Sequence, residues 1–526
     1  MIGKIILDRY SKLVASRSNW DSHWEDLARY IIPKKDNIYG YNTKGEKKDN
    51  NLFDGTSIHV NELLASALHG LLTNPSVHFF NLTTRDVALD NTDEVREWTQ
   101  VVIRKIHQIL SDSNFHTEIY EVYLDLGCFG TATLRVLEDP KLLVRFESRP
   151  IYESHIQENN LGVIDTVYRK FKYTAKQVME EFGEEYSPDD VKAKMISDPS
   201  CEYDIIHAVF PREEVLMDGR FGEDTPKRAK YASFYVMEKG AHVLSESGFN
   251  DFPYAVPRWS KISGEVYGRS PGMKALPDIK MLNQVMKTTI RAAQLVIAPP
   301  LQVPDDGARR TINMRPNGVN FYRAGTTSRI EPIITGARVD FGDIMMEGIR
   351  TRIRQAFFID QLQLNEGPQM TATEVIQRTE EKVRLLAPIL SRLNSELLSP
   401  LVERVFGILL RMGELPKPPS ILEGKVMNVV YSSTIAKAQK TSDADIITRL
   451  LSVAAPFIQS NPELMDNFDG DKIIRYLGNV LEAPTELFRS QKDVGELRQA
   501  RIEQQQQQME QQQQMEQAEV YSKVKQ

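Results

Sequence analysis

Carboxylates are the side chains of this sequence that come nearest to a recognisable chemical motif. The segment DNFDGDK at 466–472 has the acidic spacing from which calcium loops are built. Aligning Asp469 and Gly470 with the fifth and sixth positions of such a loop puts Met465 at the first ligand position and Tyr476 at the twelfth. A calcium loop needs carboxylate ligands at both of these positions, so this segment does not qualify as one.

Two further groups of possible metal ligands favour structural roles. Asp443 and Asp445 could share a cation, but acidic side chains at a helix start more commonly cap the helix and complement its dipole. His59, His69 and His78 lie in one helical region without the i, i+4 spacing that puts two imidazoles on one face. We therefore expect no metal site.

Motifs for phosphate binding and nucleophilic catalysis are missing from the sequence. Neither a Gly-x-x-x-x-Gly-Lys phosphate loop nor a His-Glu-x-x-His pair occurs. Sequence order singles out no Ser/His/Asp or Cys/His set, and the two cysteines, Cys128 and Cys201, are too few for a disulfide framework. We expect no cofactor and no catalytic activity, and the two thiols fit a reducing compartment.

The composition is that of a globular chain with several domains. Its 526 residues are too many for one hydrophobic core, which favours two to four domains. The net charge of -7 and the pI of about 5.9 argue against tight, static binding of nucleic acid, because such binding needs a basic surface that displaces counterions. No stretch reaches the roughly 18 apolar residues of a membrane span and no signal peptide is evident, so we expect no membrane partner.

Hydrophobic periodicity predicts a helix-rich α+β protein. The expected helices cover 8–33, 54–73, 93–111, 277–297, 340–359, 371–412 and 442–481. Between them, residues 142–259 are rich in β-branched and aromatic side chains and predict strands, with one short helix at 175–182. Residues 301–336 have no helical period and predict a small β insert between two helices.

The segment MTATEVIQRTEEKVRLLAPILSRLNSELLSPLVERVFGILLR, residues 370–411, predicts one long helix. A capping box (TATE, 371–374) opens it, and its apolar residues then recur every three or four positions. It would span roughly 60 Å at 1.5 Å per residue, which exceeds the core of a small domain. Pro388 and Pro400 each remove a backbone donor and clash with the preceding turn. We expect a kink at each proline, and the main one at Pro388.

Six segments, in one consistent order, resemble the portal (head-to-tail connector) proteins of short-tailed, podovirus-type bacteriophages. They are FDGTSIHVNELLASALHGLLTNPSVHFFNL (53–82), GCFGTATLRV (127–136), IDTVYRKFKYTAKQV (164–178), VPRWSKISGEVYGRSPGMKALPDIKMLNQ (256–284), the long helix itself and YSSTIAKAQ (431–439). Together they cover most of residues 10–440. One departure is visible, because the family favours a proline and a leucine where Thr434 and Ile435 stand.

The resemblance implies a phage portal fold and a ring of identical subunits, twelve in number, at one capsid vertex. It assigns 1–265 and 373–439 to the outer wing, 266–297 and 338–358 to the stem helices, 298–337 to the clip, 359–372 to the tunnel loop, 440–490 to the helical crown and 491–526 to a Gln-rich tail. Double-stranded DNA would pass through the ring without sequence preference during packaging and ejection.

The resemblance also implies the partners and the place of the protein. The partners would be the terminase large subunit, the tail adaptor or nozzle proteins, and the major capsid protein with its scaffold. The protein would be assembled in the host cytoplasm and would reside at the portal vertex of the virion.

The expected tunnel loop has a charge pattern that suits a channel for sliding DNA. It contains no lysine or arginine, and its polar side chains are Asp360, Gln361, Gln363, Asn365, Glu366 and Gln369. Each phosphate–cation pair would add a salt-dependent trap, so a neutral or acidic lining would let DNA pass. An ordinary solvated connection between two helices is the alternative.

The expected clip is rich in arginine. We expect inter-subunit, adaptor or terminase contacts, rather than DNA contacts, from Arg309, Arg310, Arg315, Arg323 and Arg329. Two other functions remain open at this point. One is a non-portal virion or scaffold protein that assembles through coiled-coil helices, and the other is a packaging nuclease or ATPase, which the missing motifs disfavour. The Gln-rich tail would form a helical barrel or stay disordered.

Overall fold

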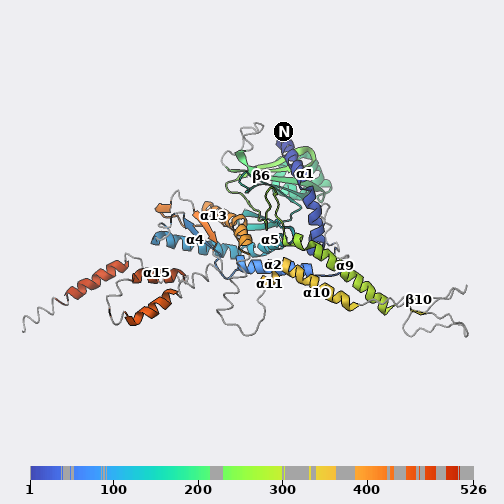
Figure 1. Ribbon diagram of the computed structural model, residues 1–526. Helices are drawn as coiled ribbons and strands as arrows, with labels where there is room; N and C mark the ends of the chain where they lie inside the picture. The colour runs from blue at the N-terminus through green and yellow to red at the C-terminus, as the bar shows by residue number, and fades with distance from the viewer. Residues whose placement is uncertain are drawn as a thin grey trace, which may run out of the picture. The chain divides into compact units, whose positions relative to one another are not determined.

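The computed structural model describes most of the chain. It covers residues 2–36, 52–84, 92–213, 229–298, 301–302, 331–332, 339–362, 386–422, 427–431, 446–457, 468–480 and 493–507, with the single residues 38, 45, 48, 86, 89, 461 and 509. Figure 1 shows the helices and strands of the chain, which divides into two compact units. The first comprises Met1–Pro75 and Ile109–Met412, and the second comprises Ser76–Gln108 and Gly413–Gln526.

The first unit contains a layer of three packed helices. They are α1 (Ile2–Ile31), α2 (Thr56–Leu72) and α5 (Phe115–Phe129). Trp24 of α1 is fully buried, and its indole N–H donates a hydrogen bond to the Phe129 carbonyl at 3.1 Å. Gly127 lets α2 and α5 approach closely, because a Cβ at this position would lie 2.1 Å from the amide oxygen of Asn61. The helices expected at 8–33 and 54–73 are confirmed, although α1 begins six residues earlier than predicted.

Two antiparallel sheets follow the helical layer in the chain. The larger is a meander of β4 (Ser154–Glu158), β5 (Ile164–Thr174), β6 (Glu202–Pro211), β7 (Tyr231–Met237) and β8 (His242–Phe249), in that order. The smaller has the order β3 (Leu143–Arg149), β2 (Thr133–Asp139) and β9 (Tyr254–Ala255). The expected block of strands between 142 and 259 is therefore confirmed.

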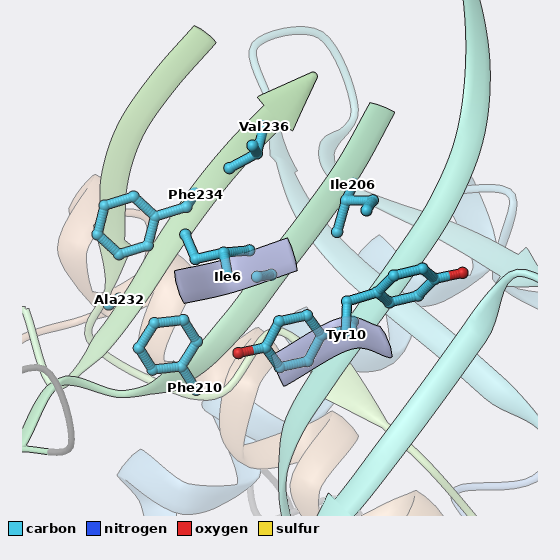
Figure 2. Packing of buried hydrophobic residues seen from close by; sticks show 9 residues of the cluster. Ile6, Tyr10, Ile206, Phe210, Ala232, Phe234 and Val236 are labelled. Carbon is cyan, nitrogen blue, oxygen red and sulfur yellow. The ribbon is translucent and has the colours of Figure 1, made fainter. Parts of the chain in front are cut away.

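Helices cover both faces of the larger sheet. On one face, Ile6 and Tyr10 of α1 pack against Phe210 of β6 and Phe234 of β7, as Figure 2 shows. On the other face, Ile205 contacts a separate apolar cluster that includes side chains of α6 (Ala175–Tyr186) and α7 (Asp189–Ser197). Because successive strand residues point to opposite faces, Ile205 and Phe210 serve different cores. The expected short helix is confirmed as α6, which begins with a capping box at Thr174, but the sequence pattern did not predict the second helix, α7.

Helices dominate the rest of the first unit. They are α9 (Pro271–Ile297), α10 (Val339–Ala356), α11 (Ile359–Leu362), a helical stretch at 386–393, a π-helical turn at Asn394–Leu398 and α13 (Ser399–Met412). Strands β10 (Leu301–Gln302) and β11 (Glu331–Pro332) form a short antiparallel pair. Short 3-10 turns lie at Pro33–Lys35 and Lys239–Ala241.

The second unit joins two distant parts of the chain. Strand β1 (Phe80–Thr84) pairs antiparallel with β12 (Met427–Tyr431), and most of α4 (Asp93–Asp112) belongs to this unit. The Trp98 indole donates a hydrogen bond to the Pro416 carbonyl at 3.0 Å. Its other elements are a 3-10 turn at Ser420–Leu422, helical residues 446–457, α15 (Gly470–Val480) and helical residues 493–507. Within the described residues, no helix is both long and apolar enough to cross a membrane.

Candidate functional site: the paired helices α9 and α10 and the long helix

The start of α9 is fixed to the helical layer of the first unit. Ser270 is its N-cap, and the Ser270 hydroxyl accepts a hydrogen bond from the Met273 N–H at 2.9 Å and donates one to the Cys128 carbonyl at 2.7 Å. Pro271 occupies the first helical position, where a missing N–H costs nothing. The sequence pattern predicted a start at Pro277, which is wrong, because the Ser270–Pro271 cap starts the helix six residues earlier.

Burial divides α9 into two halves. Its N-terminal half buries one apolar face, which includes Ile279 and Leu282, and Asn283 then accepts a hydrogen bond from the Phe53 N–H at 2.7 Å. After Asn283 no residue of α9 is buried, although the helix continues for fourteen residues that are all described. The final residue, Ile297, is 83% exposed. The helix therefore has an anchored half and an exposed half.

Helix α10 packs against α9 along much of its length (Figure 1). Its buried side chains recur every three or four residues, at Met346, Ile349 and Ile353. The two helices approach closely at Gly342, where a Cβ would lie 2.7 Å from the hydroxyl oxygen of Thr289. A side chain at Gly342 would require Thr289 or the helix backbones to shift.

Ion pairs hold the anchored end of the helix pair. Arg352 of α10 pairs with Asp278 of α9 at 2.9 Å, and Arg350 pairs with Asp54 at 2.8 Å. Burial by itself would raise the pKa of Asp54, but hydrogen bonds from Thr56 and Arg350 outweigh burial and lower that pKa below its ordinary value. Asp54 is therefore an anion that ties α10 to the start of α2.

The chain turns sharply where α10 ends. Phe358 has a φ of 61°, in the left-handed region that a bulky side chain rarely adopts. Such a conformation costs on the order of 1–3 kcal/mol and persists only where the surroundings hold it. The fully buried Phe357, the buried Ile359 and the ring of Trp259, whose centroid is 6.2 Å from that of Phe358, supply those surroundings. The turn places the four-residue helix α11 directly after α10.

The long helix changes its winding next to Pro400. Residues 394–398 form a π-helical turn, closed by a hydrogen bond from the Ser399 N–H to the Asn394 carbonyl. In an unbroken α-helix the Pro400 ring would meet the Glu396 carbonyl, and a wider turn relieves that clash. The one change of winding among residues 386–412 thus lies just before Pro400, whereas Pro388 lies in the regular stretch 386–393. That both prolines bend the helix stays a prediction.

The π-helical turn presents Glu396 to a buried arginine. Arg258 is 2% exposed, and its guanidinium donates to Glu396 at 2.8 and 3.1 Å and to Glu158 at 2.9 Å. Its remaining donors reach the Gly162 and Val266 carbonyls. Burial would lower the pKa of Arg258, but the hydrogen bonds that its guanidinium donates to Glu396 and Glu158 raise that pKa above its ordinary value. Arg258 therefore joins the long helix, the β4–β5 turn and the segment that leads into α9.

Comparison with known proteins assigns the chain to a family. Residues 4–488 match the family described as "Bacteriophage head to tail connecting protein". The chain belongs to this family. The head to tail connecting proteins are structural components of phage particles, so the expectation of a connector that is not an enzyme is confirmed.

Individual members of the connecting-protein family are similar over almost the whole chain. The "Probable portal protein" of Bordetella phage BPP-1 is 31% identical over 96% of this chain and 92% of its own length. The "Portal protein" of Salmonella phage epsilon15 is 28% identical over 95% of this chain and 91% of its own length. Among solved structures, "Virion of native gene transfer agent (GTA) particle" covers 78% of this chain and 91% of its own, with a TM-score of 0.36 and 9% identity.

Two of the predicted tunnel-loop residues of this connecting protein lie in α11. Asp360 is exposed and Gln361 is half-buried, and both follow the turn at Phe358. Outside the described residues lie Gln363, Asn365, Glu366 and Gln369, together with the clip arginines Arg309, Arg310, Arg315, Arg323 and Arg329. The DNA-channel and clip assignments therefore stay predictions.

Sequence reasoning missed the junction at Arg258. Arg258 lies in VPRWSK, and 137 residues separate it from Glu396. No local periodicity connects two such positions, because the junction exists only once the long helix has packed on the β4–β5 turn. A charged residue between apolar neighbours in this segment was the one available signal. It indicates a buried arginine but gives no partner.

Proposed function

We propose that this chain is the portal subunit of a bacteriophage. It forms a ring at one capsid vertex, through which DNA enters during packaging and leaves at ejection, and to which the tail attaches. The observation that carries this proposal is similarity over almost the whole chain to two phage proteins that are named as portal proteins. As a component of the head-to-tail connection, the protein belongs to the virion.

The two halves of α9 support an assignment of the helix pair to the stem of the ring. The stem would comprise 266–297 and 338–358, the clip 298–337, the tunnel loop 359–372, the wing 1–265 and 373–439, the crown 440–490 and the tail 491–526. A stem helix must be fixed to the wing at one end and offer its surface to neighbouring subunits at the other. Helix α9 has both properties, because one face of its first half is buried, whereas no residue after Asn283 is buried.

Exposed apolar side chains on the helix pair fit contacts between neighbouring copies. Leu295 and Val296 of α9 are 44% and 53% exposed, and Ile344 of α10 is 76% exposed. Covering apolar surface contributes roughly 25 cal/mol per Å². In a closed ring, this stabilising free energy is obtained at every interface between subunits. We therefore propose a homo-oligomeric ring, for which the resemblance to portal proteins implies twelve subunits.

The partners follow from the same assignment. The terminase large subunit would dock on the clip during packaging, and tail adaptor or nozzle proteins would replace it afterwards. The major capsid protein and scaffold would contact the wing, and assembly would take place in the host cytoplasm. Double-stranded DNA would pass Asp360 and the polar side chains after it without sequence-specific contacts.

A measurement of mass and shape tests the portal assignment directly. Mass photometry of the purified full chain should give a particle of about 720 kDa, twelve times the 60.1 kDa subunit. Negative-stain images should show rings with a central hole. An elongated monomer or dimer without a hole would instead support a scaffold protein that assembles through coiled-coil helices.

A further inference from the structure

A cavity of about 460 Å³ lies beside α13 in the first unit, away from the helix pair α9–α10. The described residues that line it are Leu137, Glu138, Gly248, Phe249, Asn250, Arg404 and Arg411. Among these side chains are two guanidinium groups and one carboxylate. The lining is therefore cationic in a chain whose overall charge is -7.

Arg404 is the buried member of the arginine pair. Its side chain is 3% exposed, and its Nη1 donates to the Asp251 backbone carbonyl at 3.3 Å. Its buried Nε has no hydrogen-bond partner among the described residues. The guanidinium carbon lies 5.4 Å from the ring centroid of Phe249, which also lines the cavity. The Arg404 guanidinium thus contacts two uncharged groups, the Asp251 backbone carbonyl and the Phe249 ring.

Arg411 lies two helical turns after Arg404 on the same face of α13. It forms shorter ion pairs with the neighbouring carboxylates than Arg404 does. It donates to Asp251 at 2.8 Å and to Glu138 at 3.1 Å. The Asp251 carboxylate is 3.6 Å from Arg404, which is a longer separation. Gly407 makes room for the Asp251 carboxylate, because a Cβ at position 407 would lie 2.7 Å from its oxygen. The two arginines therefore share one carboxylate unequally.

The charge of Arg404 is incompletely neutralised as a result. Burial, and after it the neighbouring charge of Arg411, lower the pKa of Arg404 below its ordinary value despite the attraction of Asp251 and Glu138. A buried cation that is short of counter-charge gains from an anion in the adjoining space. Planar guanidinium groups match carboxylate and phosphate oxygens with paired hydrogen bonds.

We infer that the cavity is an oxyanion site, in which a phosphate or carboxylate group binds between Arg404 and Arg411 with the Asn250 amide as a further donor. The bound group would link α13 to the strand ends that carry Glu138 and Gly248. Glu138 competes with it, because this carboxylate already accepts a hydrogen bond from Arg411. The site does not depend on the proposed portal function, because all its groups belong to one chain.

Titration with inorganic phosphate tests the site. We expect phosphate to raise the midpoint of thermal unfolding of the full chain in a saturable way, with ionic strength held constant by sodium chloride. Calorimetry should show that Arg411→Gln weakens phosphate binding at least about tenfold, since hydrogen bonds to charged groups are strong. Glu138→Gln should strengthen binding, because it removes the competing carboxylate.

Arg145→Gln is the matched control for a general loss of positive charge. Arg145 is 58% exposed on β3 and does not line the cavity, so this variant should bind phosphate as the unmodified chain does. A parallel titration with acetate separates the two ligand chemistries, and saturable binding of either anion supports the site. Equal phosphate affinity in Arg411→Gln and the unmodified chain would overturn it, as would a lack of saturable binding of both anions.

Discussion

At the scale of single residues, Arg258 gives the sharpest test of what holds the first unit together. Arg258→Met leaves Glu396 without its cation, whereas Glu158 keeps its ion pair with Lys261 at 2.6 Å. Glu396 is only about one-fifth exposed. Removing one partner of a buried ion pair costs about 3–5 kcal/mol, because the other charge stays buried without compensation. We expect a loss of that order in the free energy of unfolding, measured by chemical denaturation.

The control for Arg258→Met is an exposed ion pair on the same unit. Lys280 pairs with Asp26 at 2.8 Å, and both side chains are more than 40% exposed. Lys280→Met should therefore change the free energy of unfolding by about 1 kcal/mol or less. Equal effects of the two variants would contradict the role given to Arg258.

His207 makes the stability of the first unit depend on pH. Its imidazole is fully buried and contacts the Tyr254 and Ser233 hydroxyls, each at 3.0 Å. Burial, followed by the charge of Arg135, holds the pKa of His207 well below its ordinary value of 6.5. Just below pH 6.5 the His207 imidazole binds a proton in the unfolded chain but not in the folded one. The contribution of His207 to the free energy of unfolding is therefore complete above pH 6.5 and falls as the pH drops.

The expected slope for His207 approaches about 1.4 kcal/mol per pH unit below pH 6.5. His155, whose pKa burial also lowers well below 6.5, should add a similar slope. His23, His69 and His116, whose pKa values burial also lowers, add to the same trend. Urea unfolding at pH 7.0, 6.0 and 5.5 measures the sum, and His207→Gln should reduce the slope by up to about 1.4 kcal/mol per pH unit. A pH dependence that is the same with and without His207 would argue against this assignment.

At the scale of elements, the contact between α9 and α10 can be tested with two glycines of one helix. Gly342→Ala would place its Cβ 2.7 Å from the Thr289 hydroxyl oxygen, so we expect a loss of about 1–3 kcal/mol in the free energy of unfolding. Gly348→Ala meets no atom within 4 Å and should be neutral or stabilise by up to about 1 kcal/mol, because alanine favours the helix. Similar losses of unfolding free energy in both variants would mean that the loss in Gly342→Ala does not come from close packing of α9 on α10.

The elements also show how far sequence periodicity reaches. It predicted the helices and the block of strands, because each buries an apolar face whose spacing is local. It misplaced the start of α9 at Pro277, where the apolar stripe begins, whereas the Ser270–Pro271 cap starts the helix six residues earlier. It could not predict the pairing of β1 with β12, because residues about 350 positions apart share no local signal. The same reason hid the Arg258–Glu396 contact, whereas family resemblance supplied the function that periodicity lacked.

At the scale of the whole molecule, ring assembly should depend on the exposed half of α9. Leu295→Asp puts a charge where the proposed ring buries an apolar side chain, so we expect smaller particles by mass photometry with unchanged helix content by circular dichroism. Ile196→Asp on α7 is the control, since Ile196 is 89% exposed and lies outside the proposed stem. If Leu295→Asp still forms intact rings, the exposed half of α9 is not part of the interface between subunits.

The charge of the proposed channel gives the last prediction. Asp360 is exposed at the start of the proposed tunnel loop, and a twelvefold ring would repeat any change there twelve times. Asp360→Lys would therefore line the channel with cations, each of which pairs with phosphates and releases counterions. We expect phage with this change to give fewer DNA-filled heads in a packaging reaction, with recovery as the salt concentration rises. Asp360→Asn should package normally, because neutral side chains add no phosphate contacts. A packaging yield for Asp360→Lys equal to that of Asp360→Asn at every salt concentration would place Asp360 away from the DNA.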